Sequence, residues 1–289
     1  MKNETWNKVG SKFAHILSVH PCYSHQAHFK YARIHLPVAP RCNIQCGYCI
    51  REVNNKCEYR PGVSACIINT REALKRVEDA RKKFPLKVAG IAGPGEVLAN
   101  EESFKTLEIV HKKYPELILC IATNGLLLAE NVERLKKLGV KAVTVTINAT
   151  TPEIGAKIYK WVRYKGNVYK SVEGAKLLLE KQFEGVKAAS DAGMAVKINT
   201  VLIPGINDGE IKKIAKESAK RGAFIINIIP LIPLHDFKNW RKPTCEELEN
   251  AREIASKYLR TFRLCKQCRA DAVGIPGREK AIDSTFFHG

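Results

Sequence analysis

Short apolar runs alternate with amphipathic segments along most of the chain, and this alternation limits the folds open to it. The expected strands are 33–40, 86–96, 117–125, 141–150, 195–205 and 223–233, and the expected helices are 101–113, 132–139, 171–192, 208–221 and 243–259. Strands that alternate with helices form a parallel sheet with right-handed crossovers. A complete eight-fold barrel needs about 250 residues, and about six units fit here. We therefore predict an α/β fold, a partial (β/α)6 TIM-like barrel.

Residue types at the segment ends support this division. Asn100 is a possible N-cap, Gly193 follows a long helical pattern, and Thr244 with Glu247 has the spacing of a capping box. The stretches before and after the alternating region look irregular. We expect an N-terminal extension (1–32), a barrel (33–260) and a C-terminal cysteine-containing tail (261–289). In such sheets the ligand site lies at the carboxyl ends of the strands.

Composition and charge indicate where in the cell the protein works and which classes of partner it binds. No apolar run approaches the ~20 residues that span a bilayer, and residues 1–13 lack the apolar core of a signal peptide. We expect a cytoplasmic protein, monomeric and without a membrane partner. The formal net charge is +19. Lysine and arginine are spread along the whole chain without a nucleic-acid-binding motif, which favours a solvated basic surface, or one that attracts anionic ligands, over a nucleic-acid interface.

Ten cysteines stand in the sequence, and in a reducing cytoplasm such a number indicates metal binding or catalysis rather than disulfides. Cys42, Cys46 and Cys49 follow the first expected strand with the spacing Cys-x3-Cys-x2-Cys. Three thiolates can hold three corners of a 4Fe-4S cube and leave the fourth iron open to another ligand. The alternative is a zinc knuckle that recruits a fourth ligand such as Cys57.

This motif, with Tyr48 before its third cysteine, resembles the signature of the radical S-adenosylmethionine (radical SAM) superfamily. The resemblance implies that the amino and carboxylate groups of SAM chelate the open iron, and that an electron from the cluster then yields a 5′-deoxyadenosyl radical. Further stretches fit the same superfamily. The implied SAM contacts are Tyr48, the residues Gly93, Gly95 and Glu96 of "GPGE", Thr123 and Asn124 of "TNG", Asn148, Asn199, and the backbone around Ile228 for the adenine.

The stretches "HPCY", "IHLPVAPRCNIQCGYC", "RPGV", "GIAGPGEVLAN", "VLIPGIND" and "CRADAVG" together resemble a narrower family, the nitrogenase cofactor biosynthesis proteins called NifB. The likeness covers roughly residues 20–277. The chain ends soon after "CRADAVG", so we expect the short, stand-alone form without a C-terminal cofactor-carrier domain. The resemblance implies a function: two 4Fe-4S clusters are fused, with a carbide derived from SAM, into the eight-iron precursor of nitrogenase cofactors.

The resemblance also implies three clusters and their ligands. Cys42, Cys46 and Cys49 would hold the SAM cluster and are the catalytic residues. Cys22, Cys120 and a histidine would hold one substrate cluster; we favour His35, and His28 is the alternative. Cys57, Cys265 and Cys268 would hold the other, although the loop 50–59 departs from the family spacing and Cys66 could replace Cys57. The implied partners are proteins that deliver iron–sulfur clusters, an electron donor such as ferredoxin, and a downstream cofactor scaffold or carrier.

Two other classes of function remain open on the sequence alone. One is a radical SAM enzyme with auxiliary clusters that acts on a peptide or nucleotide, which would leave Cys22 and Cys120 without a role. The other is a non-enzymatic iron–sulfur scaffold, which would leave Glu96 and the asparagines at the strand ends without one. Iron analysis separates a protein with three clusters from an enzyme with one, because three cubane clusters contain ~12 irons per chain and a single cluster ~4.

Overall fold

A curved sheet of eight strands forms the body of the molecule in the computed structural model, which describes residues 12–54 and 58–278. The strand order is β12-β11-β10-β7-β6-β5-β1-β13. Every neighbouring pair is parallel except β1 with β13. The strands are β1 Ala32–His35, β5 Leu86–Ile91, β6 Ile118–Thr123, β7 Val140–Thr146, β10 Ala195–Leu202, β11 Ile225–Pro230, β12 Arg260–Thr261 and β13 Val273–Gly274.

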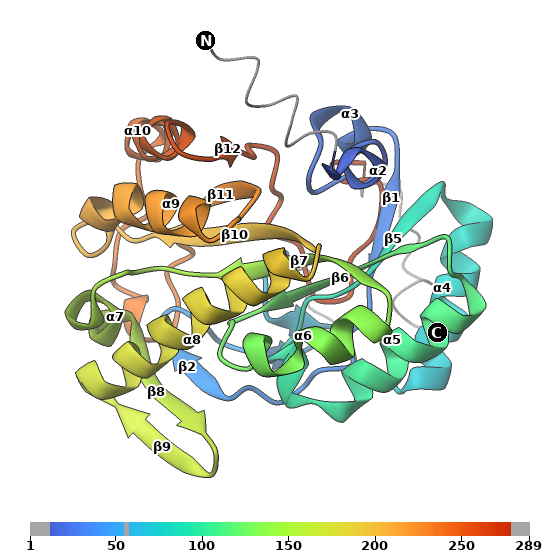
Figure 1. Cartoon of the computed structure of the whole chain (residues 1–289), viewed down its shortest axis with the longest axis horizontal. Helices are drawn as coiled ribbons and strands as arrows, with labels where there is room; N and C mark the ends of the chain where they lie inside the picture. The colour runs from blue at the N-terminus through green and yellow to red at the C-terminus, as the bar shows by residue number, and fades with distance from the viewer. Residues whose placement is uncertain (1–11, 55–57, 279–289) are drawn as a thin grey trace.

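Helices follow these strands and lie along the outer side of the sheet (Figure 1). The sheet begins and ends on separate edge strands within the described chain, so the partial barrel of six β/α units predicted from the alternation is confirmed. The helices are α2 Ala14–Leu17, α3 His25–His28, α4 Thr70–Lys83, α5 Glu101–Lys113, α6 Leu128–Lys137, α7 Pro152–Ile158, α8 Ser171–Asp191, α9 Ile211–Lys220 and α10 Cys245–Ser256, with 3-10 turns η1 Val97–Ala99, η2 Asp208–Glu210 and η3 His235–Phe237.

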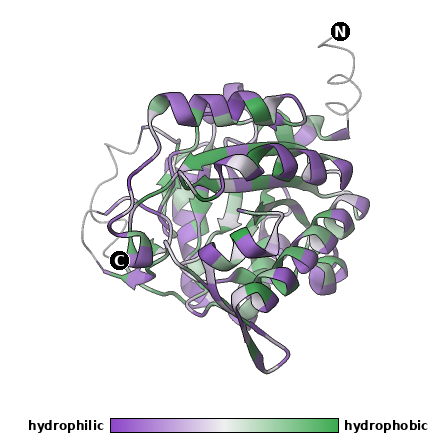
Figure 2. Ribbon diagram, turned by 90° about the vertical axis from the view of Figure 1, so that its left-hand side faces the viewer, coloured by the Kyte–Doolittle hydropathy of each residue, from purple (hydrophilic) through white to green (hydrophobic). Residues whose placement is uncertain are grey.

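The main apolar core fills the space between the sheet and these helices, where strand residues such as Ile121 and Val145 meet Val132 and Val186. Figure 2 shows the consequence, with hydrophobic strands enclosed by helices that carry a hydrophilic outer face. Within the described ranges, no helix combines the length and the apolar character that a membrane-spanning segment needs.

The N-terminal segment closes the end of the barrel at which the strands begin. Phe13, Ile16 and Tyr23 pack with Ile118, Ala195 and other residues from the starts of the strands. The Tyr23 hydroxyl lies 3.1 Å from the carbonyl oxygen of Val143 and 3.3 Å from that of Ala195. Because this end is filled, the barrel opens at the carboxyl ends of its strands.

Two small sheets lie beside that opening. Strand β2 (Ile44–Cys46) pairs with the hairpin of β8 (Tyr159–Tyr164) and β9 (Asn167–Lys170), which projects from the body in Figure 1. Strands β3 (Glu52–Val53) and β4 (Val63–Ser64) form the other. The sequence pattern did not indicate this hairpin, α4, α7, β12 or β13.

Several predicted boundaries differ from those observed. Helix α6 begins before the predicted 132, and β6 ends at Thr123, because the Asn124 N–H donates to Glu96 and not to a neighbouring strand. Asn100 precedes α5 as predicted but does not cap it. Its side-chain amide donates to the carbonyls of Arg41 and Glu96 instead. The capping box of Thr244 and Glu247 is confirmed at the start of α10.

Candidate active site

The cysteine loop, residues 42–49, is held in shape by its own backbone and by one glutamine. The Gln45 side-chain amide donates to the carbonyls of Cys46 (2.9 Å) and Cys49 (2.8 Å), and the Cys49 N–H donates to the Cys46 carbonyl at 3.0 Å. The three thiols consequently line one cavity of about 310 Å³ at the open end of the barrel.

These thiols suit an iron–sulfur cluster. Burial raises the pKa of Cys42 to about 11, and burial followed by the neighbouring cysteines raises that of Cys46. Thiolates bind metals, so such cysteines ionise only when a metal compensates the charge. Within the described ranges, no group of three His, Cys, Asp or Glu side chains is arranged to hold one metal ion. In an iron–sulfur cube each thiolate binds a different iron, so three thiols on one loop suit a cube bound at three corners.

The glycine-rich turn after β5 lies directly against the chain that enters the cysteine loop. The Gly95 N–H donates to the Ala39 carbonyl at 2.6 Å, and the Glu96 N–H donates to the Arg41 carbonyl at 2.8 Å. A Cβ atom on Gly95 would stand 2.3 Å from the Arg41 carbonyl oxygen. Only glycine therefore allows this approach. Gly93 has a φ of +125° but does not line the cavity.

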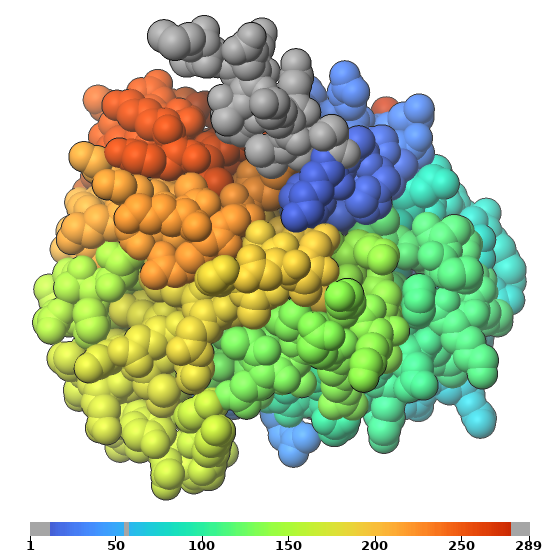
Figure 3. Space-filling model, in the orientation of Figure 1, coloured from blue at the N-terminus to red at the C-terminus, as the bar shows by residue number. Residues whose placement is uncertain are grey.

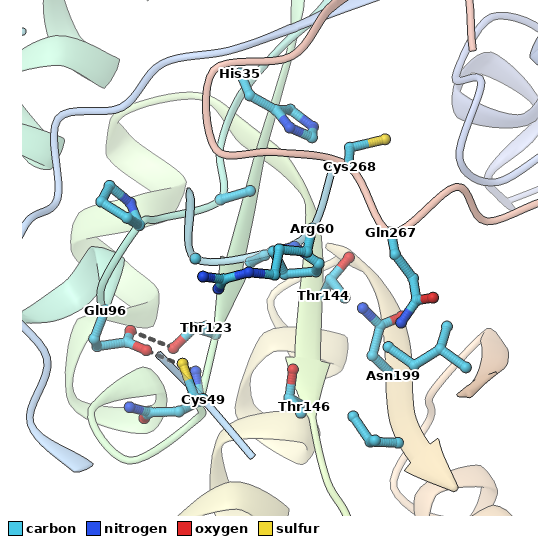
Figure 4. A pocket seen from close by; sticks show the side chains of 18 of the residues that line it. His35, Cys49, Arg60, Glu96, Thr123, Thr144, Thr146, Asn199, Gln267 and Cys268 are labelled. Carbon is cyan, nitrogen blue, oxygen red and sulfur yellow. Dashed lines mark hydrogen bonds between the residues drawn. The ribbon is translucent and has the colours of Figure 1, made fainter. Parts of the chain in front are cut away.

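Glu96 joins the ends of β5 and β6 on the cavity wall (Figure 4). Its carboxylate accepts hydrogen bonds from the Thr123 hydroxyl (2.6 Å), the Asn124 N–H (2.7 Å) and the Leu98 N–H (3.0 Å). Burial raises the pKa of Glu96, and these donors act in the opposite direction. A carboxylate fixed in this way can accept a charge-assisted hydrogen bond from an ammonium group.

The remaining predicted SAM contacts are divided between the cavity wall and the core. Tyr48, Asn124 and Asn199 line the cavity. Asn148 does not: its amide donates to the Tyr48 hydroxyl at 2.8 Å, and its Oδ1 accepts from the Val201 N–H at 2.8 Å. Asn148 thus positions Tyr48 rather than facing a ligand. The Ile228 side chain is buried in the core between sheet and helices, but Ile229 and Pro230 after it line the cavity, so the role of the backbone around Ile228 stays a prediction.

A second set of metal donors lines the same cavity, drawn from parts of the chain that are distant in sequence. They are Cys22 from the N-terminal segment, His35 from β1, Cys120 from β6, and Cys265 and Cys268 from the C-terminal segment. In Figure 4, His35 and Cys268 occupy one end of the cavity, and Glu96, Thr123 and Cys49 the other. Burial raises the pKa of Cys120 to about 12 and that of Cys268 to about 11, so these thiols too are neutral without a metal.

His35 is held in the tautomer that a metal ligand needs. Its Nδ1 lies 3.0 Å from the Arg269 carbonyl oxygen, which only accepts, so Nδ1 carries the proton and Nε2 keeps its lone pair. Burial, followed by the nearby Arg33, lowers the pKa of His35 to about 4. His28, the alternative ligand, does not line the cavity; its Nδ1 bonds to the Pro21 carbonyl at 2.8 Å.

Cys66, the alternative to Cys57, and Cys245, which was not assigned to a cluster, both lie away from the cavity. The Cys66 sulfur accepts a hydrogen bond from Arg76 at 3.1 Å, and Cys245 is exposed at the start of α10. Cys57 lies outside the described residues, so its predicted role stays a prediction. Arg60, nearby in sequence, is buried on the cavity wall and bonds to Glu52 and Glu58.

Besides Arg60, two further buried cations line the cavity, and the sequence reasoning missed both. One Arg33 nitrogen donates to the Cys268 sulfur at 3.0 Å, and Lys197 Nζ lies 3.5 Å from the Cys22 carbonyl oxygen. The alternation of side chains along a strand could have revealed both residues. Lys197 is two residues before Asn199 on β10, and Arg33 is two before His35 on β1, so each pair shares one face of its strand.

His20 adds a polar donor to the same region. The Cys22 N–H donates to His20 Nδ1 at 3.1 Å, which leaves the proton of this buried imidazole on Nε2. Nε2 is buried and has no hydrogen-bond partner among the described residues. Because a buried donor is rarely left unsatisfied, this atom indicates that the cavity receives a ligand with acceptor atoms.

Comparisons with known proteins agree with this geometry. Residues 36–217 match the family model described as the radical SAM superfamily. A FeMo cofactor biosynthesis protein NifB from Methanocaldococcus infernus is 50% identical over 279 residues, covering 96% of this chain and 92% of the relative. The NifB of Methanocaldococcus jannaschii is 49% identical, with 97% and 93% covered. That of Azotobacter vinelandii is 40% identical, with 92% and 55% covered.

Solved structures show the same fold at low identity. Streptococcus suis SuiB superposes with a TM-score of 0.60 at 14% identity, covering 90% of this chain and 53% of that one. A radical SAM methyltransferase from Sphaerobacter thermophilus gives 0.53 at 17% identity, with 80% and 64% covered. The chain, with its three-cysteine loop at the mouth of a partial barrel, belongs to the radical SAM superfamily of enzymes and, within it, to the NifB family of FeMo cofactor biosynthesis proteins.

Proposed function

We propose that this enzyme fuses two 4Fe-4S substrate clusters with a carbide derived from SAM into the eight-iron precursor of nitrogenase cofactors. One observation carries the proposal: eight thiol and imidazole donors from both ends of the chain and from the barrel line a single cavity. A radical SAM enzyme with a single cluster has no use for five donors beyond its cysteine loop.

The cysteine loop and the strand ends would have different roles in the cavity. Cys42, Cys46 and Cys49 would hold the resident cluster, and Glu96, with Thr123, Asn124 and Asn199, would position SAM. When bound, cluster and SAM supply the carbide carbon as a methyl group and the radical that removes a hydrogen atom from it. The hydrogen bonds to Glu96 keep its carboxylate oriented before SAM arrives, and Gly95 keeps the turn against the cysteine loop.

The other donors would bind the substrate clusters. Cys22, Cys120 and His35 would hold one, and Cys265 and Cys268, with Cys57, the other. A substrate that must leave as part of a product should not be held by four thiolates. The neutral imidazole of His35 leaves less negative charge on its cluster than a fourth thiolate would.

Buried charge favours the same occupants. Iron–sulfur clusters bound by thiolates are anionic, and a buried anion needs a cation or hydrogen-bond donors. Arg33 lies against Cys268, Lys197 lies beside Cys22, and His20 has a free Nε2–H at the same wall. Arg33 and Lys197 are both at least nine-tenths buried, so their charges act through little water.

We also propose the partners and domain roles that this function requires. Proteins that deliver iron–sulfur clusters would fill the cavity, an electron donor such as ferredoxin would reduce the resident cluster, and a cofactor scaffold or carrier would receive the product. Residues 33–260 would be the catalytic barrel, and residues 1–32 and 261–289 extensions that supply cluster ligands.

Anaerobic reconstitution with iron and sulfide tests the proposal. The chain should bind ~12 irons, and SAM with dithionite should then yield 5′-deoxyadenosine, S-adenosylhomocysteine and a cluster that matures apo-nitrogenase. Cys66→Ser, outside the cavity, is the control and should keep the full iron content. If the chain bound only ~4 irons and still cleaved SAM, the cluster-fusion proposal would be wrong, and the protein would be a radical SAM enzyme that acts on another substrate.

A further inference from the structure

Basic side chains gather on two segments that support the cysteine loop from its outer side. The β8–β9 hairpin, residues 159–170, carries four basic residues and no acidic one, and all four side chains are exposed: Lys160, Arg163, Lys165 and Lys170. The second segment, residues 235–242, exposes Lys238, Trp240, Arg241 and Lys242. We call these two segments together the basic surface. In Figure 3 the hairpin forms the yellow-green lower corner of the molecule.

Both segments contact the cysteine loop through the backbone. Strand β8 pairs with β2 so that Tyr159 stands opposite Cys46 and Trp161 opposite Gln45. The Gly47 N–H donates to the Ile158 carbonyl at 2.7 Å, and the Gly47 carbonyl accepts from the Asp236 N–H at 2.9 Å. A Cβ on Gly47 would meet the Phe237 ring at 2.8 Å. The basic surface is therefore joined to the metal-binding loop without an intervening layer.

The positive charge of this surface is only partly neutralised. Ion pairs join Lys160 to Asp236 (2.9 Å) and Arg241 to Glu247. Within the described ranges, no ion pair involves Arg163, Lys165 or Lys170. Arg163 and Lys165 instead lie over the aromatic rings of Trp161 and Tyr164. Exposed charge of one sign attracts a partner of the opposite sign and raises its association rate.

The cavity side of the cysteine loop cannot serve for electron delivery during turnover, because SAM and the substrate would occupy it. The outer side remains. We propose that the basic surface is the docking site of an acidic one-electron carrier protein. One electron leaves the carrier, which is oxidised, and enters the cluster held by Cys42, Cys46 and Cys49; no atom or proton is transferred. The proposal rests on the reductive chemistry of the radical SAM superfamily and not on the identity of the substrate.

A charge-reversal variant separates docking from catalysis. Arg163→Glu, Lys165→Glu and Lys170→Glu would be combined, and 5′-deoxyadenosine formation measured with a reduced acidic ferredoxin or with dithionite. We expect the ferredoxin-driven rate at low salt to fall at least ~10-fold, while the dithionite-driven rate changes less than ~2-fold because a small reductant needs no docking surface. The control combines Lys75→Glu, Lys112→Glu and Lys136→Glu, exposed lysines of α4, α5 and α6, and should keep both rates.

Binding of the ferredoxin to the immobilised, cluster-free chain gives a readout independent of turnover. Affinity should fall in the hairpin variant, and its dependence on salt should become weaker. Equal loss in the control triple, an equal fall in the dithionite rate, or loss of oligonucleotide binding with unchanged ferredoxin affinity would each overturn the proposal. The assay measures 5′-deoxyadenosine and does not depend on the final product. If the protein made no carbide-containing cluster but still needed the hairpin for ferredoxin-driven cleavage of SAM, the proposed function would be refuted and this inference would stand.

Discussion

The Nδ1–H of His35 donates a hydrogen bond to the Arg269 carbonyl oxygen across 3.0 Å, although 234 residues separate the two in sequence. The bond fixes the imidazole tautomer and ties β1 to the segment that carries Cys265 and Cys268. Strand β13 strengthens the link, because Ile34 pairs with Val273 and Arg33 with Gly274. The orientation of the His35 imidazole thus depends on the last described part of the chain.

Replacing His35 with alanine should remove one substrate cluster and leave the other two. We expect the iron content after reconstitution to fall by ~4 per chain, with SAM cleavage retained and the eight-iron product lost. Iron analysis and EPR spectroscopy measure the effect. His28→Gln is the matched variant, and its iron content should stay full. The reverse pattern in the two variants would make His28 the ligand.

Replacing Gly95 with alanine should disturb the cysteine loop, because the new Cβ would lie 2.3 Å from the Arg41 carbonyl oxygen. Backbone atoms would have to shift, which we expect to lower the free energy of unfolding by ~2–4 kcal/mol and to reduce occupancy of the SAM cluster. Gly209→Ala is the control, since nothing lies within 4 Å of its Cβ. Thermal unfolding of the apoprotein and iron content after reconstitution are the two measurements. Equal stability of the two variants would contradict the packing described here.

Replacing Lys197 with methionine removes a buried positive charge beside Cys22 at similar side-chain length. We expect weaker retention of the substrate cluster on gel filtration, and a lower reduction potential because an electron is harder to add without the cation. Lys197→Arg should restore both in part. Lys187→Met, on the exposed face of α8, is the control. A purely structural role for Lys197 would lower stability without moving the potential.

Glu210 should make stability depend on pH in acid. Its carboxylate accepts bonds from the N–H and hydroxyl groups of Thr150 and Thr151, at 2.7–3.0 Å. Burial alone would raise the pKa of Glu210, but these bonds and Lys213 lower it to about 2. Since the folded pKa lies below the unfolded value of about 4.5, the contribution is complete above pH ~4.5 and is lost as the pH falls towards ~2.

Urea unfolding of the apoprotein at several pH values tests this. At pH 7, Glu210→Gln should lower the free energy of unfolding by ~1.5–3 kcal/mol, and the difference from the unchanged chain should shrink as the pH falls below 4. Glu133→Gln, an exposed residue of α6, should show no such difference. A constant deficit for Glu210→Gln across the pH range would mean that its charge is not the stabilising element.

The fold was predictable where short-range pattern decides it. Runs such as 141–150 and 195–205 are rich in apolar and β-branched residues, as is typical of buried strands in a parallel sheet, and they became β7 and β10. The β8–β9 hairpin was missed because its burial does not follow the two-residue alternation of a strand: the buried residues of β8 stand three apart, and β9 has none. Its pairing partner β2 lies more than 100 residues earlier. Helix α4 has a capping box at Asn69 and Glu72, a local signal that was not used.

The candidate site was predictable as a set of residue types and not as a geometry. The cysteine spacing indicated three ligands of one cluster, and strand ends indicated Glu96 and Asn124. Asn148 also stands at a strand end, but its amide is bound by Tyr48 and Val201, contacts that no local pattern reveals. Nothing in the local sequence distinguishes Arg33 from a surface arginine, because it is β13 and the Cys268 segment that bury it. Contacts between residues more than 200 positions apart, such as Arg33 and Cys268, cannot be predicted from the local sequence pattern.

The antiparallel pairing of β1 with β13 has a consequence for biogenesis. Translation delivers Cys42, Cys46 and Cys49 first, whereas Cys268 and the strand that anchors it follow more than 200 residues later. A nascent barrel can present the first set of thiols while the opposite wall is still missing. The wall that carries Cys268 and covers Arg33 is therefore completed only after synthesis has passed residue 274, so the cavity is finished in the direction in which the polypeptide is made.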